Sequence, residues 1–313
     1  MFTAFMVSAA AVPLAVLWIC GANVLVALGR NRAFAMANLL GPVCSTAAIC
    51  AAAAMDRLST TFVIWATLAA TLATYAFTSF VVRVPWRGPR TPVRRVLRDG
   101  VTYAGGQISE AASYRLDQAI ALPLIGAEAA GLYSVAATIA LVPYSLGQAI
   151  GSAAFRHLAA APGPRDLKTR SSAVIRIAIV SGTCTSIFLG AASPVLVPAV
   201  FGPEFEGAVV PTLLGLVGSI AVVVTYVASS ALTAAGKGWS MTIGQLFAVA
   251  SGTIALLILG PTLGAAGASI ASALGYWTGA VVMLLGIGAP LGALVPRPRD
   301  VGAARRMLTR GAV

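Results

Sequence analysis

One feature repeats along almost the whole sequence: runs of roughly 20 apolar residues, each ended by proline, glycine or charge. A helix of that length crosses ~30 Å of hydrocarbon, and the period-two alternation of barrel strands is absent. Pro143 falls inside one run and predicts a kink there. We predict nine membrane-spanning helices near residues 5–28, 34–54, 60–82, 101–126, 130–155, 173–200, 208–234, 240–260 and 265–289.

Composition supports this fold class. Hydrophobic residues make up 58% of the 313 residues and charged residues only 10%, whereas a soluble domain carries about 25% charged residues. The sequence therefore predicts an all-α, polytopic membrane helix bundle. The four cysteines lie within apolar runs without metal-ligand spacing, so we expect free, small, buried apolar residues at Cys20, Cys44, Cys50 and Cys184.

The basic residues fall mainly on one side of these nine spans. Nineteen of the 21 Lys and Arg lie on that side, with Arg57 opposite and Arg115 inside a span. The positive-inside rule makes the basic side cytoplasmic. We therefore expect a cytoplasmic-membrane protein with its C-terminus inside and its N-terminus, as given, outside. The net charge of +12 then points to anionic membrane lipids as partners rather than to nucleic acid.

The segment 84–100 separates three spans from six. Val93, Val96 and Leu97 lie opposite arginines in it, which predicts an amphipathic helix on the inner leaflet; an ordinary solvated connector is the alternative. The segment 162–176 repeats this pattern more weakly. We predict a partial N-terminal lobe of three spans (1–83), this linker (84–100), a six-helix C-terminal lobe (101–290) and a basic cytoplasmic tail (291–313).

Ionisable groups at membrane depth are expensive and mark functional candidates. The span 101–126 holds three, Glu110, Arg115 and Asp117. One helical face there is polar, and it needs a water-filled cavity or a polar neighbour. A structural ion pair with another helix is the alternative. Arg115 lies about 160° around the helix from Asp117, so it must find its own carboxylate, carbonyl or anionic ligand. The polar face comprises Gly106, Ser109, Glu110, Ser113, Tyr114 and Asp117.

Signatures of an enzyme are missing from the sequence. The stretch 234–238 resembles a phosphate-binding loop, but residue 231 is alanine where its first glycine should stand and no strand precedes it. No nucleophile–base pair or metal-ligand cluster has catalytic spacing. We expect no enzymatic activity, no catalytic residues, no metal site and no cofactor.

Several phrases resemble the polysaccharide flippases of the multidrug/oligosaccharidyl-lipid/polysaccharide exporter superfamily. They are RLDQ at 115–118, AAGLYSVA at 129–136, FGPEF at 201–205 and LGAAGASIA at 263–271. Their order and spacing cover roughly residues 100–290. Members of that family usually have twelve or fourteen helices in two six-helix lobes, so the resemblance implies that the first three helices are missing here. A misassigned start, a truncated gene or a nine-helix form would each explain the difference.

The resemblance implies ion-coupled alternating access that moves a polyprenyl-diphosphate-linked glycan across the membrane. Arg115, with Tyr114 and Ser113 beside it, would bind the anionic head group. Glu110 or Asp117 would bind the coupling ion, Na⁺ or H⁺. Two alternatives remain: a small-molecule or drug exporter of the same architecture, which would not need Arg115, and a non-transporting scaffold for glycan assembly enzymes or a truncated remnant.

Overall fold

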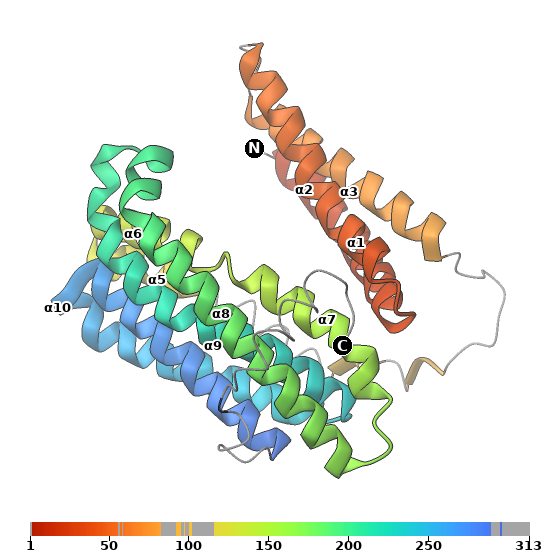
Figure 1. Cartoon of the computed structure of the whole chain (residues 1–313). Helices are drawn as coiled ribbons and strands as arrows, with labels where there is room; N and C mark the ends of the chain where they lie inside the picture. Colours follow the sequence, from red (N-terminus) through yellow and green to blue (C-terminus); the bar gives the residue numbers. More distant parts are fainter. Residues whose placement is uncertain are drawn as a thin grey trace. The chain divides into compact units, whose positions relative to one another are not determined.

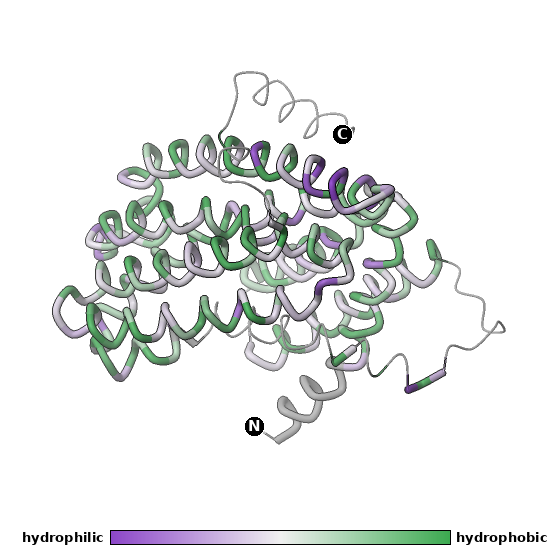
Figure 2. Tube along the Cα trace, turned by 90° about the horizontal axis from the view of Figure 1, so that it is seen from below, coloured by the Kyte–Doolittle hydropathy of each residue, from purple (hydrophilic) through white to green (hydrophobic). Residues whose placement is uncertain are grey.

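The computed structural model describes residues 2–55, 57, 59–82, 92–94, 97, 100, 101, 116–288 and 295, of which 2–12, 31, 116 and 118 are described by their backbone alone. The elements in this part of the chain are all helices, which confirms the all-α membrane bundle. The chain divides into two compact units, Met1–Arg90 and Thr91–Val313. Figure 2 shows few strongly hydrophilic positions along the helices. Six helical stretches of the described residues are long and apolar enough to cross a membrane.

The first unit contains three helices that lie side by side (Figure 1), α1 (Phe2–Ala27), α2 (Asn31–Ala54) and α3 (Thr60–Val82). Their bounds follow the predicted spans within a few residues. Threonines of α3 lie against glycines of the other two helices: a Cβ placed on Gly21 would stand 3.2 Å from Thr78 Cβ, and one on Gly41 would stand 3.2 Å from Thr74 Oγ1. Both threonine hydroxyls donate to carbonyls of α3 itself, so small side chains and internally satisfied hydroxyls allow close packing.

The second unit is built around α9 (Val209–Ala234), which follows the short 3₁₀ helix η1 (Pro203–Ala208). This central helix packs against α6 (Ala127–Ala140), α7 (Tyr144–Ala159), α8 (Pro164–Phe201) and α10 (Gly238–Ile287) (Figure 1). The main core cluster joins side chains of α7, α8, α9 and α10, among them Ile150, Ile175, Val223 and Met283. A further helix, α5 (Leu116–Ile125), packs on α6 and α10.

Helix α10 comprises 50 residues but is not straight. Gly264 has φ 57° and ψ −130°, a conformation that only glycine adopts readily. Residues at similar distances in sequence before and after Gly264 contact each other: Gly252 lies against Gly275, Ala248 against Gly279, and Gly244 against Met283. The two halves therefore form an antiparallel helical hairpin, which matches the two spans predicted at 240–260 and 265–289.

Two other predicted spans differ in detail from the structure. The span 130–155 is divided between α6 and α7, because α7 begins directly after Pro143, as the predicted kink requires. The span 173–200 belongs to a longer helix: α8 begins at Pro164. The weakly amphipathic connector predicted at 162–176 is thus mostly the first turns of α8, since a helix with proline in its first turn can begin there.

The expectation that the cysteines are buried is wrong. Cys20, Cys44, Cys50 and Cys184 are free thiols, as expected, but all four are exposed on the surface of the helices. An apolar run does not distinguish a side chain that faces lipid from one that faces protein, since both surroundings are apolar. The tail 291–313, apart from Val295, and most of the linker 84–100 lie outside the described residues.

Candidate functional site: a carboxylate between three helices

Asp117 lies in the first turn of α5 and contacts hydroxyl groups of two other helices. The Tyr133 O–H of α6 donates to Asp117 Oδ2. The Ser272 O–H of α10 donates to the same oxygen at 2.9 Å. The two hydroxyl oxygens are themselves 2.7 Å apart. These three side chains, which we call the Asp117 cluster, concentrate hydrogen-bond donors on one carboxylate oxygen.

Local structure explains why Asp117 and Tyr133 meet. Gly126 has φ 82° and separates α5 from α6, and its lack of a Cβ allows this positive φ without a steric penalty. Asp117 is nine residues before the turn and Tyr133 seven residues after it, so an antiparallel pair of helices places them at similar depth.

Ser272 reaches the cluster from the second half of α10. Ala121, Ala268 and Ala271 form one core cluster with Tyr133 and Leu256, and these small side chains let α10 approach α5 and α6 closely. Ser272 Oγ also lies 3.1 Å from the Ala268 carbonyl oxygen, a second acceptor for its single hydroxyl hydrogen. The site is therefore held by well-packed helices rather than by loops.

A small cavity adjoins the Asp117 cluster. It has a volume of about 20 Å³, and its wall includes Tyr133, Ser269, Ser272 and Tyr276. That volume holds one water molecule or one small cation, because a single water needs roughly 10–15 Å³ measured in the same way. Tyr133 is only 2% exposed, so this part of the cluster is well shielded from solvent.

The same cavity extends to the break between α6 and α7. Ala137, Ala140 and Leu141 also line it. The Ser219 O–H of α9 donates to the Ala140 carbonyl, one of the last carbonyls of α6 that the helix itself cannot satisfy. The Asp117 cluster and the break between α6 and α7 thus share the wall of one cavity.

The chemistry available to the cluster is that of an oxygen-only site. A carboxylate and hydroxyl oxygens bind a proton or a hard cation such as Na⁺, and the carboxylate changes from charged to neutral when it takes up a proton. In the ranges that the structure describes, no group of three or more His, Cys, Asp or Glu could hold a metal ion.

The structure describes only one of the five predicted site residues. Asp117 is half-buried and has the polar neighbours just described. Glu110, Ser113, Tyr114 and Arg115 lie outside the described residues.

Tyr133 and Ser272 were not singled out from the sequence. For Tyr133 a signal existed, because it follows Asp117 across a glycine turn and lies within the AAGLYSVA phrase. Ser272 comes from 155 residues away, and a serine within an Ala/Gly-rich helix has no distinguishing mark in the sequence.

Comparison with known proteins identifies the family. The family model described as "Polysaccharide biosynthesis protein" matches residues 3–210, about two thirds of the chain. The chain belongs to this polysaccharide biosynthesis protein family. The matched segment includes the first three helices. The sequence motifs that resemble the flippases all lie after residue 100. No curated protein matches the chain significantly.

Solved structures show which fold this family member shares. A MATE protein in its straight conformation is 18% identical with a TM-score of 0.66, over 88% of this chain and 62% of that one. A multidrug resistance MATE family transporter of the MOP superfamily, in an outward-facing conformation, is 17% identical with a TM-score of 0.66, over 87% and 63%. A MOP superfamily transporter from Pyrococcus furiosus is 18% identical with a TM-score of 0.50, over 67% and 50%.

These likenesses show the fold of the polysaccharide biosynthesis family member. It is a multi-pass membrane protein with the MATE-type helical architecture. The chain spans 62% of the length of the MATE structure in the straight conformation.

Proposed function

We propose that this protein moves a lipid-linked oligosaccharide or another polysaccharide precursor across the cytoplasmic membrane, and that cation binding at Asp117 drives the movement. The observation that carries the proposal is the Asp117 carboxylate of α5, one oxygen of which accepts hydrogen bonds from a hydroxyl of α6 and a hydroxyl of α10. The chain that holds it belongs to the polysaccharide biosynthesis protein family.

The coupling ion acts through the charge of Asp117. With the ion absent, the carboxylate is negative and attracts the hydroxyls of α6 and α10. Bound H⁺ or Na⁺ neutralises that charge and removes the electrostatic attraction that holds both hydroxyls on the carboxylate. The cavity beside the cluster reaches Ala140 and Leu141. A change in how α6 and α10 pack around Asp117 therefore acts on the break between α6 and α7. A ligand shifts a conformational equilibrium only through such a difference in binding between two states.

The substrate end of the proposal rests on the residues that precede α5. Arg115 is the residue immediately before Leu116, at which α5 begins, and a guanidinium group binds a diphosphate through paired hydrogen bonds. Tyr114 and Ser113 supply hydroxyls next to it in sequence. Glu110 is a second candidate for the coupling ion. We further propose glycan assembly enzymes of the membrane as partners that supply or take up the substrate.

The decisive experiment is transport by the purified chain in liposomes. A fluorescent polyprenyl-diphosphate oligosaccharide is placed in one leaflet, and its movement is followed under a Na⁺ gradient, a proton gradient or neither. Ion-dependent movement that Asp117→Asn removes supports the proposal, and the effective gradient identifies the ion. Folded protein that moves no labelled lipid under either gradient contradicts it.

A drug exporter is the second candidate, because one of the structural neighbours is described as a multidrug resistance MATE family transporter. Such an exporter would move cationic compounds and would not need Arg115. Efflux of a cationic dye by the same liposomes, unchanged by Arg115→Gln, would favour it. Co-purification of glycan assembly enzymes with a chain that transports neither substrate would favour the scaffold instead.

A further inference from the structure

A second cavity lies where two helix turns of the C-terminal unit meet. It has a volume of about 170 Å³ and lies between the α7–α8 turn and the α9–α10 turn. Its walls include Leu158, Leu167, Leu232 and Ile287, and its charged lining residues are Lys168 and Lys237. This cavity, which we call the lysine cavity, is therefore an apolar space with two cations and no lining carboxylate among the described residues.

Both lysines converge on the end of α10, which is at Ile287. Lys237 Nζ donates to the Gly286 carbonyl at 3.0 Å. Lys168 Nζ lies 3.1 Å from the point where a Cβ on Gly288 would stand. The negative end of a helix dipole is worth roughly half a charge, so two ammonium groups exceed it. The pair leaves a net positive charge at the edge of the cavity.

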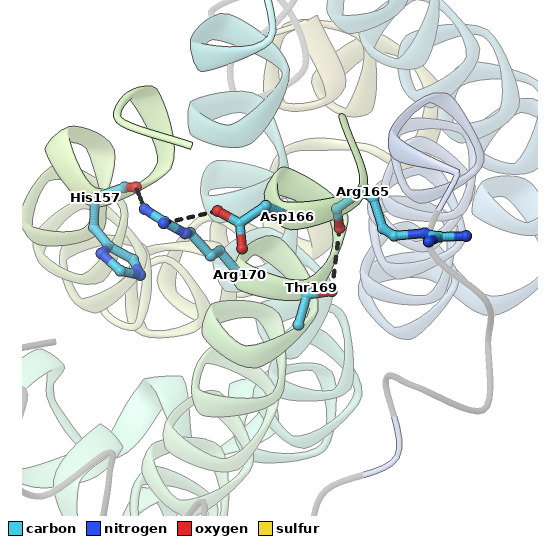
Figure 3. A network of polar contacts seen from close by, with 5 residues as sticks. All are labelled: His157, Arg165, Asp166, Thr169 and Arg170. Carbon is cyan, nitrogen blue, oxygen red and sulfur yellow. Dashed lines mark hydrogen bonds and ion pairs between the residues drawn. The ribbon is translucent and has the colours of Figure 1, made fainter. Parts of the chain in front are cut away.

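The polar network beside the cavity does not neutralise these lysines. Arg170 Nη2 pairs with Asp166 Oδ2 at 2.7 Å, and Arg170 Nη1 donates to the His157 carbonyl at 2.8 Å. Figure 3 shows this clamp between the end of α7 and the start of α8, with the Arg165 side chain directed away from it. Asp166, the acidic residue nearest to Lys168 in sequence, is thus engaged by another cation. The clamp also fixes the turn that forms one wall of the cavity.

The location indicates where a ligand would come from. The helix ends around the lysine cavity carry Arg156, Arg165 and Arg170 in addition to the two lysines, and the basic side is the predicted cytoplasmic side. Apolar walls with a cationic edge at a membrane surface complement a phosphate group attached to a hydrocarbon chain. The volume is below the roughly 300 Å³ of ordinary small-molecule pockets, so it admits a head group with adjoining carbons and not an oligosaccharide.

We propose that the lysine cavity binds the phosphate-bearing head of an anionic phospholipid of the cytoplasmic leaflet. Lys168 and Lys237 contact the phosphate, and the first carbons of the lipid lie against Leu158, Leu232 and Ile287. The bound lipid joins the α7–α8 and α9–α10 turns and stabilises the C-terminal unit. This site is separate from the Asp117 cluster and does not depend on the proposed transport activity.

The test is binding of phosphatidylglycerol to the purified full chain in a zwitterionic detergent, measured by native mass spectrometry and by the shift in melting temperature. Phosphatidylcholine and soluble glycerol 3-phosphate are titrated in parallel. The double variant Lys168→Gln/Lys237→Gln should weaken phosphatidylglycerol binding by about 10- to 30-fold, on the order of what two phosphate-facing cations contribute. Lys168→Arg/Lys237→Arg should keep binding within about threefold, because it keeps both charges.

The matched control removes two other exposed cations of the same predicted side, Arg32→Gln/Arg94→Gln, and should change binding less than about twofold because neither lines the cavity or belongs to the turns around it. Ala161→Leu fills part of the cavity and keeps both lysines. It should weaken binding even if the glutamine variant does not fold.

Three results would overturn the proposal. Equal losses in the control and the glutamine variant would indicate general surface charge. Equally tight binding of glycerol 3-phosphate would assign the site to a free phosphate compound. Unchanged binding in both Ala161→Leu and the glutamine variant would place the lipid elsewhere.

Discussion

The central helix of the second unit is buried to a far greater degree than the helices of the first unit. In the second unit, 61% of the apolar stretch of Pro203–Ala234 is buried inside the protein, whereas the stretches of Arg32–Ala54 and Thr60–Val82 in the first unit are 6% and 11% buried. Apolar character alone does not account for this, because Pro164–Phe201 and Gly238–Ile287 in the second unit are nearly as apolar as Pro203–Ala234 and are each only 17% buried. Large side chains such as Leu39, Trp65 and Phe80 are exposed in the first unit.

This difference shows that hydropathy fixes which segments enter the membrane but not which of them form a protein core. The second unit supplies its own apolar neighbours, so α9 is enclosed by four other helices. The exposed faces of the first unit need lipid or further protein as neighbours, because such apolar area is too large to remain in water. The Asp117 cluster belongs to the enclosed unit, where packing can hold it in place.

The largest expected effect concerns transport. Asp117→Asn removes the charge that binds the coupling ion, and we expect ion-driven movement of the labelled lipid to fall at least about 100-fold, as for loss of an essential group worth roughly 3 kcal/mol or more. Its control is Thr74→Val/Thr78→Val, which changes buried hydroxyls of the first unit that donate to carbonyls of α3 itself. Transport in the control should stay within about threefold. A control as damaged as Asp117→Asn would assign coupling to both units.

Core packing gives the next largest effect. Leu232→Ala in α9 removes a fully buried side chain and should lower the free energy of unfolding by about 2–5 kcal/mol. Leu39→Ala in α2 makes the same chemical change at an exposed position and should cost less than about 1 kcal/mol. Reversible unfolding in mixed micelles measures both. Equal losses would mean that Leu39 is enclosed by a neighbour in the membrane.

A glycine pair compares the turns of the two units. Gly264→Ala forces alanine into a conformation that suits only glycine and should destabilise the protein by about 1–3 kcal/mol. The site is not crowded, since the nearest atom to a new Cβ is Ala129 Cβ at 3.7 Å, so the cost is backbone strain. Gly29→Ala, at φ 70° between α1 and α2, should cost about 1–2 kcal/mol. Thermal melts of both variants that show the opposite order would contradict this account of the α10 hairpin.

The smallest expected effect concerns the α6–α7 break. Ser219→Ala leaves the Ala140 carbonyl without the hydroxyl of α9 and should cost about 1 kcal/mol, the low end of the penalty for an unsatisfied buried group, because water can enter the adjoining cavity. Thr71→Val removes a hydroxyl that donates to Thr67 of its own helix and should be within about 0.5 kcal/mol of neutral. The same unfolding measurement separates them, and a neutral Ser219→Ala would show that this bond does not hold the break.

The sequence carried much of the fold and one member of the candidate site. Helix bounds in the first unit and the division at Pro143 followed from apolar length and from proline. Asp117 was recognisable because a carboxylate within an apolar helix is costly. Its partners Tyr133 and Ser272 were not, because hydroxyl-bearing residues are inexpensive at membrane depth and occur throughout these helices.

By itself, the sequence determined that this chain enters a membrane as helices and, to within a few residues, where the spans of the first unit begin and end. Each span satisfies its own backbone hydrogen bonds, so its existence depends only on consecutive residues. The tertiary structure alone decided which apolar faces are buried, why the cysteines are exposed, and which hydroxyls meet Asp117. Those outcomes depend on how helices distant in sequence pack together, and lipid and protein interiors are too alike in polarity for hydropathy to distinguish them.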